Sequence, residues 1–385
     1  MRLARDRPED DLILCIARRG CTADLIRPSL NWDYLVATAS VHGLLPLLYK
    51  NLSTVADLIP PHALSRLKRE SVSNTQAVLH LVGKQIRLFQ QFKEHNVPIA
   101  TFKGAVLAQM AYGEISLRQA GDIDMLIHRR DFNRAKSLLE SLGYQMFPKL
   151  TPAQLASHLH HHCEITFVRD DWFTVVDLHW DLAPKSFVFN LETDEVMSRL
   201  QSISLAGTVV ETFGAEDSVL YQSMHGATHL WRRLEWIVAL AESLRPGVRW
   251  DALILRAESA RTTRMFALGL RLVEEFSDVK VPLHVFARID ADKTMERLAA
   301  KIRAQIFLIS GPADSAETNL YNLRIMDRKR DALLSALRAI FVPTFPDWQA
   351  LALPASLHPL YYAIRPLRLS KVYGSSLLRR VVRNA

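Results

Sequence analysis

Two aspartates one residue apart interrupt an apolar stretch of the sequence, GDIDMLIH. Polar and apolar residues that alternate in this way are typical of a β-strand, in which residues i and i+2 share a face. Asp122 and Asp124 would therefore share one face of a strand, and Ile123, Met125 and Ile127 the other. Neighbouring carboxylates repel each other unless a cation lies between them, and a hard ion prefers carboxylate oxygens while leaving positions open for phosphates. The pair predicts a site for Mg²⁺, or for a similar ion such as Mn²⁺.

About twenty residues earlier, Lys103 and Gly104 follow the short apolar segment VPIATF. We expect this segment to be a strand and Gly104 to open a helix that ends at Gly113. A glycine at such a turn lets the backbone approach a phosphate, and the helix N-terminus favours the anion. Lys103 would reach the phosphates as a point charge, unless it is an ordinary surface lysine. Arg118 would either hold the phosphates or pair with the aspartates when no metal is bound.

The elements that must position these residues fall into three regions. Residues 1–95 are an N-terminal helical region, residues 96–213 a core with two-residue periodicity over 97–180, and residues 214–385 a C-terminal domain that is helical to about residue 340 and ends in a basic tail. We therefore predict an α+β fold, a small mixed β-sheet core between N-terminal and C-terminal helical regions. The predicted strands of one sheet are VPIATF, GDIDMLI, HCEITFV and FTVVDLHW, and QSISLAGTVVETF is a further hairpin.

Two further local features belong to this central region. The segment RRDFNRAKSLLESLGY is predicted to be a helix capped by Asp131 and ended by Gly143. A charged turn over residues 169–171 would join the last two strands of the sheet.

The composition is that of a soluble globular protein. The chain has 385 residues, of which 49% are hydrophobic and 23% charged, enough for two or three domains. No segment approaches the about 18 consecutive apolar residues of a transmembrane helix, and the N-terminus lacks the apolar core of a signal peptide. Cys15, Cys21 and Cys163 have no CxxC spacing, which favours a reducing, cytoplasmic setting.

The net charge of +8 is concentrated at the C-terminal end. No acid follows Asp347, whereas six cations do: Arg365, Arg368, Lys371, Arg379, Arg380 and Arg383. Such a basic tail could contact an anionic surface, nucleic acid or a phosphorylated substrate. It could equally pack against acidic residues of its own chain.

Taken together, four segments resemble a known family: TFKGAVLAQMAYGEISLRQAGDIDMLI, VVDLHWDL, HGATHLWRRLEWI and YYAIRPLRL. They are similar to uncharacterised bacterial nucleotidyltransferases of the polymerase-β-type superfamily, from about residue 35 to about residue 375. In that superfamily, two aspartates and a third acid from a neighbouring strand hold metal ions that position an NTP for attack on its α-phosphate. The chain departs from the superfamily's Gly-Ser at Lys103-Gly104, and from the family's frequent aspartate at Ala239.

Asp177, in TVVDLHWDL, is the predicted third acid, because its strand is apolar and therefore central to the sheet. Alternation places it on one face with Val175 and His179. Glu164 on the preceding strand is the competing candidate, whereas Asp181 is expected to be a cap. His179 could orient an acid, act on the incoming hydroxyl, or be a structural hydrogen-bond partner.

Two further groups of histidines are less informative. The run of His158, His160, His161 and His162 would alternate in direction on a strand and has no paired cysteines, so a structural zinc site is not expected. His225 and His229 are spaced i, i+4 on one helix without an HExxH glutamate, and we expect them to pack against the core.

The leading functional prediction is the transfer of a nucleoside monophosphate from an NTP to an acceptor hydroxyl or phosphate. The acceptor could be a small molecule, a sugar, a protein side chain or an RNA end. One alternative is a non-catalytic nucleotide-binding or interaction module that kept the fold. Another is a metal-dependent phosphohydrolase, although the sequence lacks an additional His/Asp cluster near the two aspartates.

Overall fold

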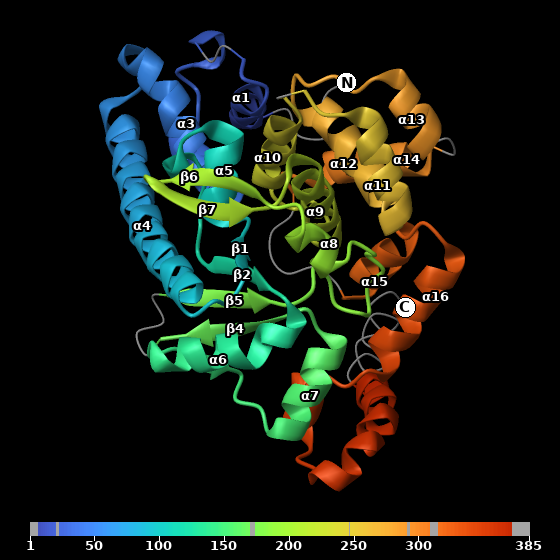
Figure 1. The fold of residues 1–385 in the computed structure, drawn as a ribbon. Helices are drawn as coiled ribbons and strands as arrows, with labels where there is room; N and C mark the ends of the chain where they lie inside the picture. The colour runs from blue at the N-terminus through green and yellow to red at the C-terminus, as the bar shows by residue number, and fades with distance from the viewer. Residues whose placement is uncertain are drawn as a thin grey trace.

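A five-stranded mixed sheet lies at the centre of the chain, between two helical regions (Figure 1). The computed structural model describes residues 7–20, 23–169, 174–245, 247–290, 293–308 and 315–371. The strand order is β1-β2-β5-β4-β3. The strands are β1 (Ile99–Thr101), β2 (Ile123–Ile127), β3 (Gln145–Phe147), β4 (Glu164–Val168) and β5 (Val175–His179). The four predicted strands therefore share one sheet, as expected, and β3 joins them as an unpredicted edge strand.

The pairing of β2 with β5 is the one parallel pairing among the described strands. On the face that the sequence predicted to be apolar, Ile123, Met125 and Ile127 are buried with Val176 and Leu178 in one cluster. The opposite face of the same two strands carries the acids. The turn predicted over residues 169–171 falls partly outside the described residues.

Helices before the sheet form the N-terminal region as predicted. They are α1 (Pro8–Ala17), α2 (Trp32–Val41), α3 (Leu45–Leu52) and α4 (Pro61–Glu94). Helix α4 starts after Pro60 and ends next to His95, where the sequence pattern ends. Gly43, with φ +72°, separates α2 from α3, and a Cβ at this position would lie 2.0 Å from the Glu235 carboxylate. Glycine is therefore required both by the backbone conformation and by the close approach of the C-terminal region.

Within the central region, helix α5 (Gly104–Tyr112) follows β1 and ends at Gly113, whose φ of +68° is left-handed. Helix α6 (Phe132–Ser141) lies where it was expected. The Asp131 side chain does not cap α6 and instead accepts a 3.0 Å hydrogen bond from Arg134.

The histidine run lies on a helix, and the strand expected for it is wrong. Helix α7 (Pro152–His161) opens with a capping box between Thr151 and Gln154, which satisfies the free backbone N–H groups at its start. Helix α8 (Thr193–Met197) and the hairpin of β6 (Gln201–Leu205) and β7 (Thr208–Thr212) complete the central region, and the hairpin confirms the prediction.

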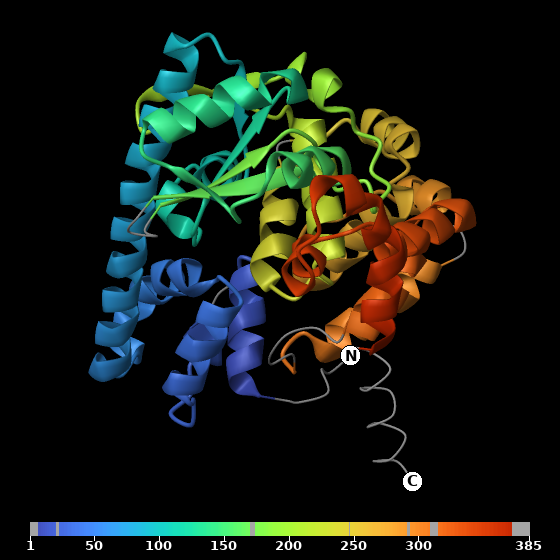
Figure 2. The same ribbon diagram turned by 90° about the horizontal axis from the view of Figure 1, so that it is seen from below.

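The C-terminal region is helical, as predicted. Its helices are α9 (Ala215–Thr228), α10 (Leu234–Leu244), α11 (Trp250–Ala260), α12 (Thr263–Phe276), α13 (Leu283–Ile289), α14 (Thr294–Gln305), α15 (Ser315–Arg324), α16 (Lys329–Phe341) and α17 (Phe345–Ala350). One buried cluster runs from Leu12 to Ile325 and includes Phe102 and Leu126 of the sheet region. The view from below shows these helices beside the sheet and opposite the N-terminal helices (Figure 2). Among the described residues, no helix is long and apolar enough to cross a membrane.

Candidate active site

Three carboxylates gather where β2 and β5 run side by side. The parallel register pairs Asp124 directly with Asp177. Asp122 lies just before β2, and the charges of both other acids act on it. On the other side of β5, Thr166 of β4 donates a 2.7 Å hydrogen bond to Asp177 Oδ1. Two neighbouring strands thus bring together the three acids that the sequence singled out.

Burial and repulsion between the acids raise the pKa of two of these carboxylates. Burial, followed by the charges of Asp124 and Asp177, raises the pKa of Asp122 to about 6. Burial also raises the pKa of Asp177, and Asp124 adds to the effect despite the hydrogen bond from Thr166. Asp124 is different: although it is completely buried, Lys103 and His179 hold its pKa below the ordinary value.

Lys103 is an internal partner of the acids, so the alternative of an ordinary surface lysine is wrong. Its Nζ donates a 2.7 Å hydrogen bond to Asp124 Oδ1, and 19% of the side chain is exposed. Burial opposes the charge, yet Tyr221 and Asp124 raise the pKa of Lys103 well above its usual value. The amine also lies 5.3 Å from the ring centroid of Phe102 and 5.5 Å from that of Tyr221, within cation–π range.

The backbone at this turn is strained. Lys103 has φ +60° and ψ −157°, a conformation that favours glycine, and Gly104 follows with φ +43°. Strain of this kind persists only where the surroundings determine the conformation, and here the hydrogen bond to Asp124 and the start of α5 do so.

His179 links two acids across the sheet. Its ring is buried, with Nε2 3.1 Å from Asp124 Oδ1 and Nδ1 2.9 Å from the Glu164 carboxylate. Burial lowers the pKa of His179, but Glu164 and Asp124 more than offset this and leave it well above the usual value. Glu164, the competing third acid, is thus turned toward His179, whereas Asp177 is the register neighbour of Asp124. Of the roles considered for His179, the geometry favours orienting an acid.

Cys163 lies beside this pair and completes a group that sequence reasoning missed. The Cys163 sulfur, a Glu164 oxygen and a His179 nitrogen lie within 4.8 Å of one another. Sulfur and imidazole donors suit a transition metal better than magnesium. In the structure, however, both nitrogens of His179 face carboxylates, and burial raises the pKa of the Cys163 thiol. Within this group, His179 is the residue that contacts Asp124, through its Nε2.

Arg118 does not pair with the aspartates, so that alternative is wrong for this structure. Its Nε lies 2.5 Å from the Glu235 carboxylate of α10, and its Nη1 donates a 3.3 Å hydrogen bond to the carbonyl of Gly104. Arg118 thereby connects the turn at the start of α5 to the C-terminal helices. A contact with phosphate stays a prediction.

Behind Lys103 lies a small cavity of about 30 Å³, between the sheet and α9 and α10. Its lining includes Phe102, Tyr221 and His225. Burial lowers the pKa of His225 well below its usual value, so this ring is neutral, and both His225 and His229 contact Trp236. The expectation that these two histidines pack against neighbouring structure rather than bind metal agrees with these contacts.

The raised pKa of Asp122 gives a pH-dependent expectation for the metal-free protein. A carboxylate whose pKa is higher in the folded than in the unfolded chain contributes stability below the unfolded value, and that contribution is lost as the pH rises through about 6. In the presence of a chelator, Asp122→Asn should therefore be more stable than wild type at pH 7, by at most about 3 kcal/mol, and equal to it near pH 4. Urea unfolding across this range would measure the difference. Asp57→Asn, at an exposed position, should show no such trend.

Comparison with known proteins identifies the family. The model of a family described as uncharacterised nucleotidyltransferase matches residues 28–278, more than half of the chain. The chain belongs to this nucleotidyltransferase family. No curated protein sequence matches it.

Two solved structures of ANT(2″)-Ia resemble the nucleotidyltransferase distantly. The crystal structure in complex with adenylyl-2″-tobramycin has a TM-score of 0.33 at 16% identity, covering 48% of this chain and 96% of that one. The solution structure of the same antibiotic-resistance factor has a TM-score of 0.27 at 15% identity, and the match covers 60% of this chain and 94% of that one. The family assignment rests on the family model alone.

Proposed function

We propose that this nucleotidyltransferase transfers a nucleoside monophosphate from an NTP to a hydroxyl or phosphate acceptor in the cytoplasm. Asp122, Asp124 and Asp177 would hold Mg²⁺ or Mn²⁺. The observation that carries the proposal is the direct pairing of Asp124 with Asp177 on adjacent parallel strands, with Asp122 one strand step away. The charge of Asp124 raises the pKa of both Asp122 and Asp177, and a divalent cation would remove this repulsion.

When bound, such an ion neutralises charge on the phosphates of the NTP and orients the α-phosphate for in-line attack. The chain's own residues have complementary tasks. Lys103 would contact a phosphate as a point charge, and the backbone at Gly104 opens a helix whose N-terminus favours the same anion. His179 and Thr166 hold Asp124 and Asp177 in place, and Arg118 steadies the Gly104 turn.

The second candidate, a non-catalytic nucleotide-binding module, has one observation in its favour. Lys103 and His179 both contact the same oxygen of Asp124, so protein cations already compensate that carboxylate. A module of this kind would bind nucleotide without consuming it, whereas the proposed enzyme must release pyrophosphate.

The test is incubation of the protein with each α-labelled NTP, Mg²⁺ or Mn²⁺, and cell extract. We expect label to appear in a new product only when metal is present. Fractionating the extract into small molecules, polysaccharide, protein and RNA before labelling would assign the acceptor class. Nucleotide binding without labelled product or pyrophosphate in any fraction would favour the non-catalytic module.

Metal-dependent binding gives a more direct expectation. Mg²⁺ with NTP should raise the melting temperature of the wild type, and Asp122→Asn should reduce this rise because one ligand and one negative charge are lost. Thermal melts with nucleotide, with and without chelator, would measure it. Asp194→Asn, which alters an exposed acid paired with His128, is the matched control. A nucleotide-induced rise that is identical in wild type and Asp122→Asn would contradict a metal role for Asp122.

A further inference from the structure

Helix α16 turns an apolar stripe toward solvent. Leu333, Leu337, Ile340 and Phe341 are 61%, 43%, 41% and 43% exposed. Their spacing of i, i+4, i+7 and i+8 puts all four on one face of the helix. A surface helix ordinarily buries such a stripe against the core, so α16 has the opposite orientation.

Polar contacts on the other face explain why α16 is held this way. Asp331 and Ser335 are the residues of this helix that are buried. Ser335 Oγ donates a 2.5 Å hydrogen bond to the carbonyl of Ser186, and Arg261 lies 3.4 Å from Asp331. The inward face is thus fixed by hydrogen bonds and an ion pair, whereas the apolar face is exposed and, among the described residues, is not buried against another element.

The exposed apolar surface continues along the chain beyond α16. Nine of the eighteen large apolar side chains that the described residues expose lie between residues 333 and 367. After α16 they are Leu351, Leu357, Leu360, Tyr362 and Leu367. Half of the large apolar side chains exposed by the described residues thus fall within 35 residues, which is not the even scatter normal for a soluble protein.

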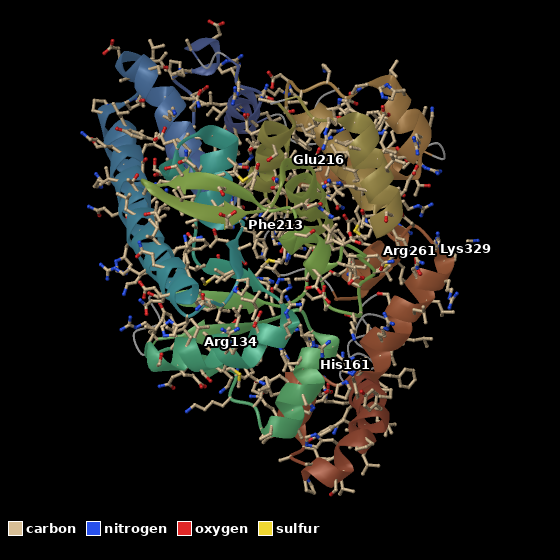
Figure 3. The ribbon with its side chains drawn as sticks, viewed as in Figure 1. Arg134, His161, Phe213, Glu216, Arg261 and Lys329 are labelled. Carbon is tan, nitrogen blue, oxygen red and sulfur yellow. The ribbon has the colours of Figure 1, made fainter. Side chains whose placement is uncertain are left out.

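The charges around this surface are positive. After Asp331 the described residues contain one acid, Asp347, and four cations, Arg338, Arg365, Arg368 and Lys371. Asp347 is fully buried, at 2.6 Å from Arg365 and 2.5 Å from Arg368, so this acid and its two arginines together carry a net charge of +1. Lys329 and Arg330 open α16 and are exposed, and Lys329 lies at the outer edge of the molecule (Figure 3).

We propose that α16 and the segment that follows it dock this protein on an anionic lipid surface, with the apolar stripe inserted at the headgroup boundary. Helices that lie in a membrane interface combine an apolar face with flanking lysine and arginine, which anionic lipids attract. A symmetric dimer through the same surface would bring cations against cations. In an anionic bilayer, the acyl region would bury the apolar stripe and the headgroups would attract the flanking cations. The inference does not depend on the chemistry proposed for the active site.

The experiment is co-sedimentation of the full chain with vesicles of phosphatidylcholine alone and of an equal mixture of phosphatidylcholine and phosphatidylglycerol. We expect the wild type to bind the anionic vesicles and to be released from them by high salt. Leu333→Asp combined with Leu337→Asp should weaken partitioning at least about tenfold, because two inserted side chains become charged. Leu283→Asp, at an 87% exposed leucine on α13, should bind as the wild type does.

Circular dichroism would verify that both variants fold, and Leu333→Ser combined with Leu337→Ser provides a second, uncharged pair. Three outcomes would overturn the proposal. The wild type could fail to bind anionic vesicles, Leu283→Asp could weaken binding as much as the α16 substitutions do, or both α16 double variants could bind as the wild type does. Sedimentation equilibrium of the protein without vesicles tests the alternative that a second copy of the chain covers the stripe. A dimer that the α16 substitutions dissociate, without vesicle binding, would assign the stripe to a second copy of the chain.

Discussion

Asp177→Asn should lower nucleotidyl transfer at least about a thousandfold, which corresponds to about 4 kcal/mol of transition-state stabilisation. The reason is its position: Asp177 is the register partner of Asp124, and the hydrogen bond from Thr166 restrains its carboxylate. Asparagine preserves the shape but removes the charge that a divalent cation requires. Initial rates of pyrophosphate release, with NTP, metal and the active extract fraction, would measure the loss.

Glu164→Gln is the matched comparison for that experiment. Glu164 contacts His179 rather than the paired aspartates, so its loss should act indirectly and reduce the rate far less. Circular dichroism and melting temperature would show that both variants are folded. If Glu164→Gln were the more damaging change, Glu164 would be the third acid and the assignment of Asp177 would be wrong.

Lys103→Met should destabilise the metal-free protein by about 3 kcal/mol and make added Mg²⁺ more stabilising than it is for the wild type. Removing one partner of a buried ion pair leaves the other charge uncompensated. The Asp124 side chain is 2% exposed, and His179 would be its remaining partner. A divalent cation could then replace the lost amine. Urea unfolding with chelator and with Mg²⁺ would give both free-energy differences.

Lys50→Met supplies the contrast for Lys103. Lys50 forms a 2.8 Å ion pair with Glu114, but both side chains are about half exposed. Exposed pairs contribute about 0–1 kcal/mol, so this change should have little effect, with or without Mg²⁺. Equal losses for the two substitutions would mean that Lys103 does not compensate a buried charge.

The strands that position the acids could be predicted because one face of each is buried. Alternation around Asp122 and Asp177 reflects that burial directly, and the apolar faces are as expected. Strand β3 gave no such signal, because Gln145 and Phe147 are exposed at the edge of the sheet. The strand predicted for the histidine run is wrong, and the capping box of Thr151 and Gln154 is the local signal that indicates a helix there.

The partners of the site residues could not be predicted in the same way. His179 meets Asp124 across 55 positions of sequence, and Arg118 meets Glu235 across more than a hundred. Tyr221 lies against Lys103 and belongs to α9. The sequence of α9 predicts that the helix is buried, but not which residues it contacts. Contacts of this kind depend on how the helical regions pack on the sheet, and no local periodicity encodes that packing.

Phe102, the residue before Lys103, is anchored both by the end of the central region and by the first helix of the C-terminal region. Its ring stacks on Phe213 at 4.6 Å and meets Tyr221 of α9 edge to face at 5.1 Å. Phe213 lies near the middle of the molecule, where the hairpin leads into α9 (Figure 3). A chain cut after residue 213 would keep Phe213 but lose Tyr221 of α9 and Glu235 of α10, and would loosen the turn that orients Lys103. The smallest portable piece of this protein, for excision or for transplantation into another chain, therefore has to extend through α9 and α10.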